Sequence, residues 1–393
     1  MSTDASRLNE VLACLPPRSG EGIDWSGLSK TLLGNVLSEM EKTEQNPVYH
    51  GEGNVLNHTL RVCEALLADA EYRESTEEDR LVLILAALLH DIGKIRCTTM
   101  RDGAIVSPRH SIVGATMARD LLWRELGLCG SRAHRQLREA VCNLIRYHSY
   151  PPFAMTDADA ERKLLKIAAN GELVPIFTLR KLCLLERADV LGRVSCDAED
   201  YLMRIGFCRA LAEELGCLDK PYSFASPYSA RAYFLGKTDW RDAELFCDTW
   251  GEVILMSGLP GTGKDTWIGT EHPDLPTVSL DAIRARLCIS PTEPQGPVVA
   301  AAREEAREYL RRRQPFIWNA TSVTAQLRSA QISLFESYGA SVKAQFLETA
   351  WEEELARNAA RAATVPQSAI ERMLSRLELP ERYECESVSW EIT

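Results

Sequence analysis

The sequence predicts a multidomain protein, with an all-α N-terminal domain followed by an α/β C-terminal domain built on a parallel sheet. Its 393 residues exceed what one compact core usually holds. Residues 1–245 have the patterns of helices almost throughout. After Glu252, short apolar runs alternate with helical segments, which is typical of parallel sheets. We place the domains at 1–219 and 250–393 and an ordered connector at 220–249.

The helical part contains one segment that is apolar on all sides, from Leu81 to Leu89. A helix without a polar face is a buried one, so we expect this helix at the centre of the first domain. Amphipathic helices are expected around it, at residues 111–126, 134–148, 161–169, 173–191 and 197–215. In the second domain, strands are expected at 253–256, 315–319 and 341–347.

Composition narrows the class of protein. A net charge of −11 argues against a broad basic surface for nucleic acid, although a nucleic-acid terminus in a local pocket stays compatible with it. The 12 cysteines contain no Cys-x-x-Cys pair, and with no signal peptide at the start we expect free thiols in the cytoplasm. No apolar run approaches the roughly 20 residues that cross a bilayer, so no membrane partner is expected.

A row of histidines and aspartates in the first domain predicts a metal site. His90 and Asp91 close the apolar helix, where polar side chains are costly unless something satisfies them. Imidazole and carboxylate together suit divalent transition metals, and one carboxylate can bridge two ions. The complete row is His58, His90, Asp91, His110, His148 and Asp189.

This order resembles the H…HD…H…H…D pattern of the HD-domain phosphohydrolase superfamily, over about residues 46 to 195. The resemblance implies two divalent transition metals. One would be bound by His58, His90, Asp91 and Asp189, and the other by the bridging Asp91 with His110 and His148.

Two further residues follow from the same resemblance. Lys94 would neutralise charge on the phosphate, while the metals polarise a phosphoryl oxygen and supply a hydroxide. His50, in the segment 49–53, resembles a loop found ahead of the first metal histidine in some members. It would contact substrate or protonate a leaving group.

A phosphate-binding loop follows the first strand of the second domain. Gly258-x4-Gly263-Lys264 lies between a predicted strand and a predicted helix, as the motif requires, and its amides would cradle phosphate while Lys264 reaches the β- and γ-phosphates. The next residue should be Ser or Thr for Mg²⁺ but is Asp265, so either Thr266 takes over or Asp265 holds the metal, directly or through water. The expected nucleotide-binding residues are Gly258, Gly261, Thr262, Gly263, Lys264, Asp265 and Thr266.

The segment 279–284 resembles the acceptor site of phage-type polynucleotide 5′-kinases. By that resemblance Asp281 accepts the proton of a 5′-hydroxyl and Arg284 binds the neighbouring phosphate. Arg357 and Arg361 resemble the lid arginines of the same kinases, which stabilise the transferred charge. The segment 319–322, after the second strand, is placed to orient phosphate or metal.

The two halves together resemble the bacterial HD-Pnk family of bifunctional RNA end-healing enzymes, over about residues 46 to 385. The family implies hydrolysis of 2′,3′-cyclic phosphate and 2′-phosphate ends and phosphorylation of 5′-hydroxyl ends by ATP or GTP with Mg²⁺. The implied partners are RNA or DNA ends, the NTP and a separate RNA ligase. Two alternatives remain open: a nucleotide phosphatase joined to a small-molecule kinase, and an HD hydrolase gated by a nucleotide-sensing domain.

Overall fold

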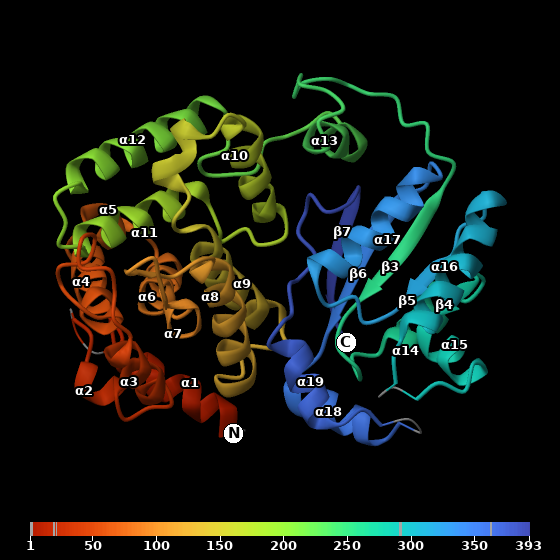
Figure 1. Cartoon of the computed structure of the whole chain (residues 1–393), viewed down its shortest axis with the longest axis horizontal. Coiled ribbons are helices and arrows are strands. Elements are labelled where there is room, and N and C mark those ends of the chain that lie inside the picture. Colours follow the sequence, from red (N-terminus) through yellow and green to blue (C-terminus); the bar gives the residue numbers. More distant parts are fainter. Residues whose placement is uncertain (1–2, 19, 21, 291–292, 362–363) are drawn as a thin grey trace. The chain divides into compact units, whose positions relative to one another are not determined.

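The computed structural model describes residues 3–18, 20, 22–290, 293–361 and 364–393. The predicted fold class is confirmed, because a helical unit is followed by a unit with a parallel sheet (Figure 1). The chain divides into Met1–Tyr222 and Ser223–Thr393. The segment taken as a connector contains a short helix, α13 (Pro227–Phe234), and most of it lies in the second unit.

The first unit is helical apart from one hairpin. Its α-helices are α1 (Thr3–Ala13), α2 (Trp25–Leu28), α3 (Gly34–Lys42), α4 (Val55–Ala68), α5 (Ala70–Glu74), α6 (Glu77–Leu89), α7 (Lys94–Cys97), α8 (His110–Asp120), α9 (Arg132–Tyr147), α10 (Ala160–Ala168), α11 (Leu179–Gly192) and α12 (Ala198–Glu214). A π-helical turn, η1 (Leu121–Glu125), extends α8, and 3₁₀ turns η2 (Pro151–Thr156) and η3 (Ala169–Glu172) flank α10.

Helix α6 is the buried centre of this unit, as predicted. The Thr76 side chain accepts a hydrogen bond from the amide of Asp79 and so caps the helix. All residues from Val82 to Leu89 are at most 2% exposed. The helix therefore carries His90, its C-cap residue, into the interior of the unit.

Helices α8 and α9 are fastened together by a buried charge network. Glu139 of α9 accepts hydrogen bonds from Arg119 of α8 at 2.7 Å and from Arg138 at 2.7 Å. The Arg138 guanidinium also stacks on Trp123, 3.9 Å from the ring centroid. Burial acts to raise the pKa of Glu139, but the charges of Arg119 and Arg138 outweigh it and lower this pKa to about 2. The network fixes the two helices that carry His110 and His148.

Two features of the first unit differ from expectation. The hairpin β1 (Thr99–Arg101) and β2 (Ala104–Val106) was not predicted, although its Asp102-Gly103 turn is a hairpin signal. The helix expected from 173 begins only at Leu179, because Thr178 caps it with its side chain.

The second unit is a five-stranded parallel sheet in the order β4-β5-β3-β6-β7. The strands are β3 (Glu252–Ser257), β4 (Thr277–Ser279), β5 (Ile317–Asn319), β6 (Ser341–Glu348) and β7 (Ser387–Ile392). The helices besides α13 are α14 (Lys264–Glu271), α15 (Leu280–Arg286), α16 (Gly296–Arg311), α17 (Ala325–Ser337), α18 (Trp351–Ala359) and α19 (Gln367–Leu374). The predicted strands correspond to β3, β5 and β6, while β4 and β7 were missed.

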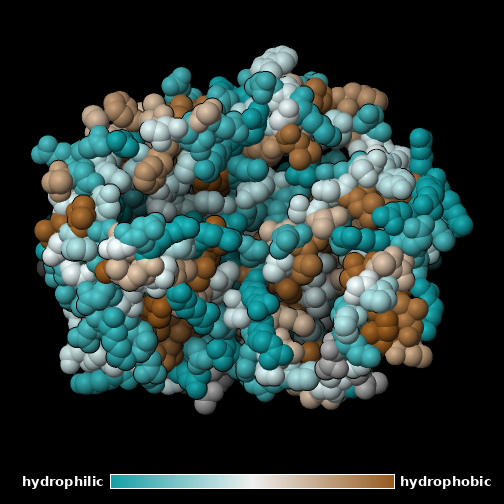
Figure 2. Space-filling view, viewed as in Figure 1, coloured by the Kyte–Doolittle hydropathy of each residue, from teal (hydrophilic) through white to brown (hydrophobic). Residues whose placement is uncertain are grey.

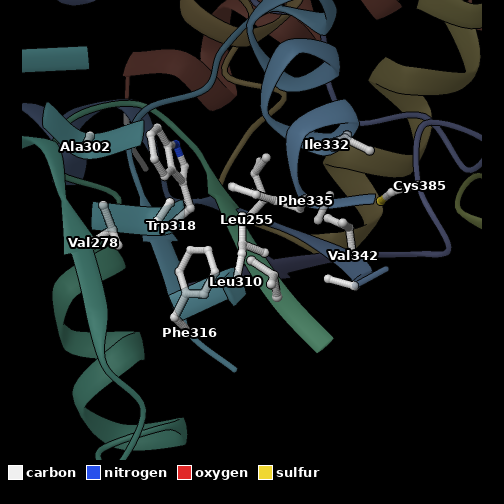
Figure 3. Close-up of a cluster of buried hydrophobic side chains, with 14 of the residues drawn as sticks. Leu255, Val278, Ala302, Leu310, Phe316, Trp318, Ile332, Phe335, Val342 and Cys385 are labelled. Atoms are coloured by element: carbon white, nitrogen blue, oxygen red, sulfur yellow. The ribbon is translucent and has the colours of Figure 1, made fainter. Parts of the chain in front are cut away.

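Alternating side chains of the central strand β3 bury both faces of this sheet. Val253 and Leu255 pack with α15, α16 and α17 in the cluster drawn in Figure 3. Ile254 and Met256 pack on the opposite face with Ile268 of α14. Since α14 starts at Lys264, this packing holds the loop between β3 and α14 at the carboxyl edge of the sheet.

Hydrophilic residues cover most of the face shown in Figure 2, and hydrophobic residues form small groups on it. Within the described part of the chain, no helix is both long and apolar enough to span a bilayer.

Replacing Glu139 by Gln should destabilise the first unit by about 3 kcal/mol or more, because two buried guanidinium groups lose the carboxylate that they share. Urea unfolding followed by circular dichroism measures this change. Glu39→Gln, which removes an exposed partner of Lys42, is the matched control and should leave the unfolding midpoint unchanged. Equal midpoints for the two variants would contradict the role assigned to the network.

Candidate metal and nucleotide sites

The histidines and aspartates predicted from the sequence converge inside the first unit. They come from five helices and their ends, and we call them the His–Asp cluster: His58 (α4), His90 and Asp91 (after α6), His110 (start of α8), His148 (C-cap of α9) and Asp189 (α11). All are at most 2% exposed except the half-buried His110.

The cluster consists of two adjoining groups of potential ligand atoms. His58, His90 and Asp189 form the first, and Asp91, His110 and His148 form the second; within each group the atoms lie within 4.8 Å of one another. Asp91 also faces the first group. Its Oδ2 is 3.3 Å from His90 Nε2, while its Oδ1 is 3.5 Å from His110 Nε2. One carboxylate therefore lies between both groups, as a bridging ligand would.

The histidine rings are held so that Nε2 faces the centre of the cluster. The Nδ1 atoms of His90, His110 and His148 lie 2.7–3.0 Å from backbone carbonyls, so each must carry a proton and donate it. The Nδ1 of His58 faces the carboxylate of Glu52 at 2.9 Å. Fixing the outer nitrogen in this way leaves a lone pair on each inner nitrogen, which is how metal-binding histidines are usually oriented.

The inner nitrogens lie close to one another, and His58 Nε2 is also 2.8 Å from Asp189 Oδ1. Nε2 of His58 is 3.3 Å from Nε2 of His90, and Nε2 of His110 is 3.4 Å from Nε2 of His148. Asp91 Oδ1 is buried without a hydrogen-bond partner. Such an electron-rich centre is costly to bury alone, and a divalent cation among imidazole and carboxylate ligands would satisfy it. The residues present fit a divalent transition metal.

The protonation states of His148, Asp91 and Asp189 agree with ligation. Burial, followed by the neighbouring rings of His110 and His90, lowers the pKa of His148 to about 3, so this ring is neutral at pH 7. For Asp91, burial acts to raise the pKa, but the charge of Lys94 outweighs it and the carboxyl stays ionised. The charge of Arg193, which donates a hydrogen bond to Asp189 Oδ2 at 2.5 Å, likewise outweighs burial and lowers the pKa of Asp189.

Glu52 is the anchor of the loop ahead of His58. Its Oε1 accepts from His50 Nδ1 at 2.8 Å and faces His58 Nδ1, while its Oε2 accepts from the amide of Val194 at 2.8 Å. Burial lowers the pKa of His50, so the ring is neutral and presents Nε2 as an acceptor. This geometry suits a contact between His50 and a substrate hydroxyl better than proton donation to a leaving group.

Lys94 lies beside the cluster rather than in open solvent. Its ammonium donates to Asp91 Oδ2 at 2.7 Å and to Gln45 Oε1 at 2.6 Å, and it is 3.5 Å from His50 Nε2. Lys94, whose positive charge was predicted to neutralise a phosphate, therefore lies at the edge of the His–Asp cluster.

Close helix contacts fix the positions of the ligands. A Cβ at Gly192 would lie 2.5 Å from a methyl carbon of Val62, so only glycine allows α11 to approach α4 and bring Asp189 to His58. A Cβ at Gly93 would lie 2.0 Å from the carbonyl oxygen of His110. The glycine after the His-Asp pair thus allows the close approach that positions His110.

A pocket of about 460 Å³ opens onto the cluster. Cations and aromatic rings stand among its lining residues, and the hairpin β1–β2 forms part of the wall. The lining residues are Gln45, Asn46, Tyr49, His50, Asp91, Lys94, Arg101, Ile105, Val106, Ser107, Pro108, His110, His148, Ser149, Asp189, Arg193, Asp197 and Tyr201. Its volume is in the range of small-molecule sites.

In the second unit, the loop after β3 has the backbone of a phosphate cradle. Gly258 and Gly261 have φ of 143° and 94°, and a Cβ at either would lie within 2.7 Å of a carbonyl oxygen, so the turn requires glycine at both. The hydroxyl of the buried Thr262 donates to Leu259 O at 2.9 Å and braces the loop.

Lys264 lies across this loop. Its ammonium donates to the carbonyl oxygens of Gly258 at 2.9 Å and Leu259 at 2.7 Å. Burial lowers its pKa to about 8, an effect that Asp265 and Glu354 oppose. The lysine is therefore tethered at the loop until a stronger acceptor, such as a phosphate, replaces the carbonyls.

The predicted acceptor and lid residues partly come together. Asp281 forms ion pairs with Arg284 and with Arg361, the latter at 3.2 Å. Arg357 contacts Glu353 at 2.8 Å, and its Nη1 is 3.5 Å from where a Cβ of Gly263 would lie, so it borders the phosphate loop instead of Asp281.

Asp265 and Thr266 are the two residues after Lys264 that were expected to hold Mg²⁺. Both residues are exposed on the first turn of α14, and the carboxylate of Asp265 accepts a hydrogen bond from Asn319 at the end of β5.

Several contributors to these sites were missed from the sequence. Glu52 lies in the loop that drew attention to His50, and Arg193 follows Asp189 by one helical turn, so both could have been found. Gln45 is far from Lys94 in the sequence, and no local pattern points to it. Arg101 and Tyr201 likewise meet the pocket only through the fold.

The fold and sites define a helical domain with the ligand set of a metal-dependent hydrolase, joined to a P-loop domain of kinase-like type. Comparison with protein families agrees: residues 55–174 match the HD domain and residues 253–380 match an AAA domain. The first match contains every member of the His–Asp cluster except Asp189, and the second contains the phosphate loop, the acceptor pair and the lid arginines. No curated protein matches the chain.

Gly93→Ala should weaken metal binding about tenfold or more without removing a ligand, because the added methyl group displaces His110. Titration with Mn²⁺ followed by electron paramagnetic resonance measures the affinity. Gly206→Ala on α12, where a Cβ meets nothing within 4 Å, is the matched control and should bind Mn²⁺ as the unaltered protein does. Undiminished affinity in Gly93→Ala would refute the positioning role.

Glu52→Gln should lower Mn²⁺ affinity about 10- to 100-fold, because the ring of His58 loses the carboxylate that fixes its tautomer. The same titration measures it, and circular dichroism checks that the helical content is kept. The exposed Glu64→Gln on the same helix as His58 serves as the comparison and should have no effect. If both variants bind Mn²⁺ equally well, Glu52 does not orient His58.

Proposed function

We propose that this protein repairs broken RNA ends. The first unit would hydrolyse 2′,3′-cyclic phosphate and 2′-phosphate ends, and the second would transfer the γ-phosphate of ATP or GTP, with Mg²⁺, to a 5′-hydroxyl end. The prepared ends would then suit a separate RNA ligase.

The observation that carries the proposal is the position of Asp281. It follows the short strand β4 at the same edge of the sheet as the phosphate loop, and Arg284 and Arg361 both pair with it. A phosphate-transferring enzyme needs a base for the attacking hydroxyl, and such a base is worth about 10²–10⁴-fold in rate. A carboxylate at this position argues against a domain that only senses nucleotide.

In the transfer step, the oxygen of the 5′-hydroxyl bonds to the γ-phosphorus as the bond to the β-phosphate oxygen breaks, and Asp281 takes the hydroxyl proton. Arg361 and Arg357 would then stabilise the charge on the transferred group. Arg361 pairs with Asp281, so it lies where the 5′-hydroxyl would bind. Arg357 borders Gly263, so it lies where the donor phosphates would bind.

The hydrolytic half would use the pocket over the His–Asp cluster. Divalent metals supply a hydroxide nucleophile and polarise the phosphoryl oxygen when bound. Lys94 faces the phosphate charge from the edge of the ligand set, and His50 accepts a hydrogen bond from a ribose hydroxyl. In the opening of the cyclic ester, a water oxygen bonds to phosphorus, one ring P–O bond breaks and the released ribose oxygen gains the proton.

Charge distribution supports a nucleic-acid terminus as substrate. The chain carries a net charge of −11, and the pocket is lined by three cations, Lys94, Arg101 and Arg193, and by three carboxylates, Asp91, Asp189 and Asp197. With divalent metals on Asp91 and Asp189, the pocket would carry a net positive charge. Arg101 is exposed on β1. Local cations in an acidic protein favour one or two phosphates at an end over the backbone of a long strand.

The test offers the purified protein an RNA with a 5′-hydroxyl and a 2′,3′-cyclic phosphate, together with ATP, Mg²⁺ and Mn²⁺. Asp91→Ala should abolish the reaction at the 2′,3′ end and spare phosphorylation, whereas Lys264→Ala should do the reverse. Separation of the products by gel electrophoresis measures both ends in one reaction.

Free nucleosides and nucleotides offered in place of the RNA provide the comparison. Efficient turnover of these small substrates with no change at either RNA end would favour the pairing of a nucleotide phosphatase with a small-molecule kinase. If Asp281→Ala retained full phosphorylation, Asp281 would not be the base.

A further inference from the structure

Two residues beside the phosphate loop have the reverse of the usual arrangement of charge. The residue after the lysine is an acid, and the residue at the end of the neighbouring strand is a neutral amide. P-loop enzymes generally hold Mg²⁺ with a Ser or Thr after the lysine and an Asp at the end of a strand beside the loop strand. Here Asp265 follows Lys264, and Asn319 ends β5, which pairs directly with β3. The carboxylate and the neutral side chain stand in each other's usual places.

The two side chains contact each other. Asn319 Nδ2 donates to Asp265 Oδ1 at 2.6 Å. Asn319 is 8% exposed and therefore fixed by its packing at the strand end, while Asp265 is exposed on the first turn of α14. A buried amide thus orients an accessible carboxylate beside the loop that would cradle phosphate.

We propose that Asp265 and Asn319 form an inverted magnesium site, in which the loop residue supplies the negative charge and the strand residue orients it. The inference rests on the proposed binding of NTP by the second unit. Carboxylate oxygens are suitable Mg²⁺ ligands. The pair contains one carboxylate, as the usual arrangement does, but this carboxylate lies next to the phosphates.

This displacement of charge changes how metal and nucleotide depend on each other. A hydroxyl after the lysine is neutral and tolerates a phosphate without metal. Asp265 instead places a negative charge beside the phosphates, which repels them unless a cation lies between. Nucleotide and Mg²⁺ should therefore bind with strong positive coupling, and each must strengthen the other by the same factor.

A carboxylate in the first turn of α14 also interacts favourably with the helix dipole. That role would affect the stability of α14 but not the dependence of nucleotide binding on Mg²⁺. The coupling factor therefore distinguishes a metal ligand from a structural acid.

The experiment measures binding of the β,γ-imido analogue of ATP to the full-length protein by calorimetry, with excess Mg²⁺ and with EDTA. The ratio of the two dissociation constants is the coupling factor. We expect a factor of about 100 or more for the unaltered protein and less than about 10 for Asp265→Asn, mainly because the analogue then binds better without metal.

The double variant Asp265→Ser with Asn319→Asp recreates the usual arrangement. It should bind the analogue with Mg²⁺ as well as the unaltered protein, and bind it more tightly than the unaltered protein in EDTA. Asp274→Asn, at an exposed carboxylate elsewhere in the unit, is the matched control and should keep the full coupling factor. Circular dichroism verifies that each variant is folded.

Two results would overturn the inference in distinguishable ways. An unchanged coupling factor in Asp265→Asn refutes the inverted site while leaving nucleotide binding intact. Absence of analogue binding by the unaltered protein, with and without Mg²⁺, refutes the proposed kinase function and the inference with it.

Discussion

The first unit depends on one electrostatic constraint, the burial of inward-facing lone pairs and carboxylates at its centre. Each histidine of the His–Asp cluster gives its outer nitrogen to a carbonyl or to Glu52 and keeps the inner one for the centre. The positions of these side chains are fixed by the helix ends that carry them, by the close contacts at Gly93 and Gly192, and by the Glu139 network. The surrounding helices are thus arranged around a group of atoms that a bound cation would stabilise.

The residues of the His–Asp cluster were found from the order of histidines and aspartates along the chain, which resembles the HD-domain pattern, and not from the surroundings of each member. His90 and Asp91 stand out at the end of an apolar helix, and the phosphate loop is a contiguous motif. The hydrogen-bond partners of these residues were harder to find. Gln45 reaches Lys94 across a separation of 49 residues, and only the packing of distant segments creates that contact.

Strand prediction succeeded where burial on both sides gives an uninterrupted apolar run, as in β3, and where apolar residues alternate along a long strand, as in β6. It failed for β4, which has three residues, and for β7, whose residues are half-buried at the sheet edge and include the polar Ser387, Ser389 and Glu391. The hairpin β1–β2 escaped because its strands are short and largely exposed. Strands marginal in length or burial leave too weak a pattern in the sequence.

Helices α6 and α9 both end at a residue of the cluster, since His90 and His148 are their C-caps. The carboxyl end of a helix carries about half a negative charge. Two such ends lie at the cluster, and the amino end of α8, which begins at His110, carries the opposite partial charge, so the three ends together add roughly half a negative charge to those of Asp91 and Asp189. The resulting field attracts a dication more strongly than a monovalent ion, so the backbone itself contributes to the choice of ion before any side chain coordinates it.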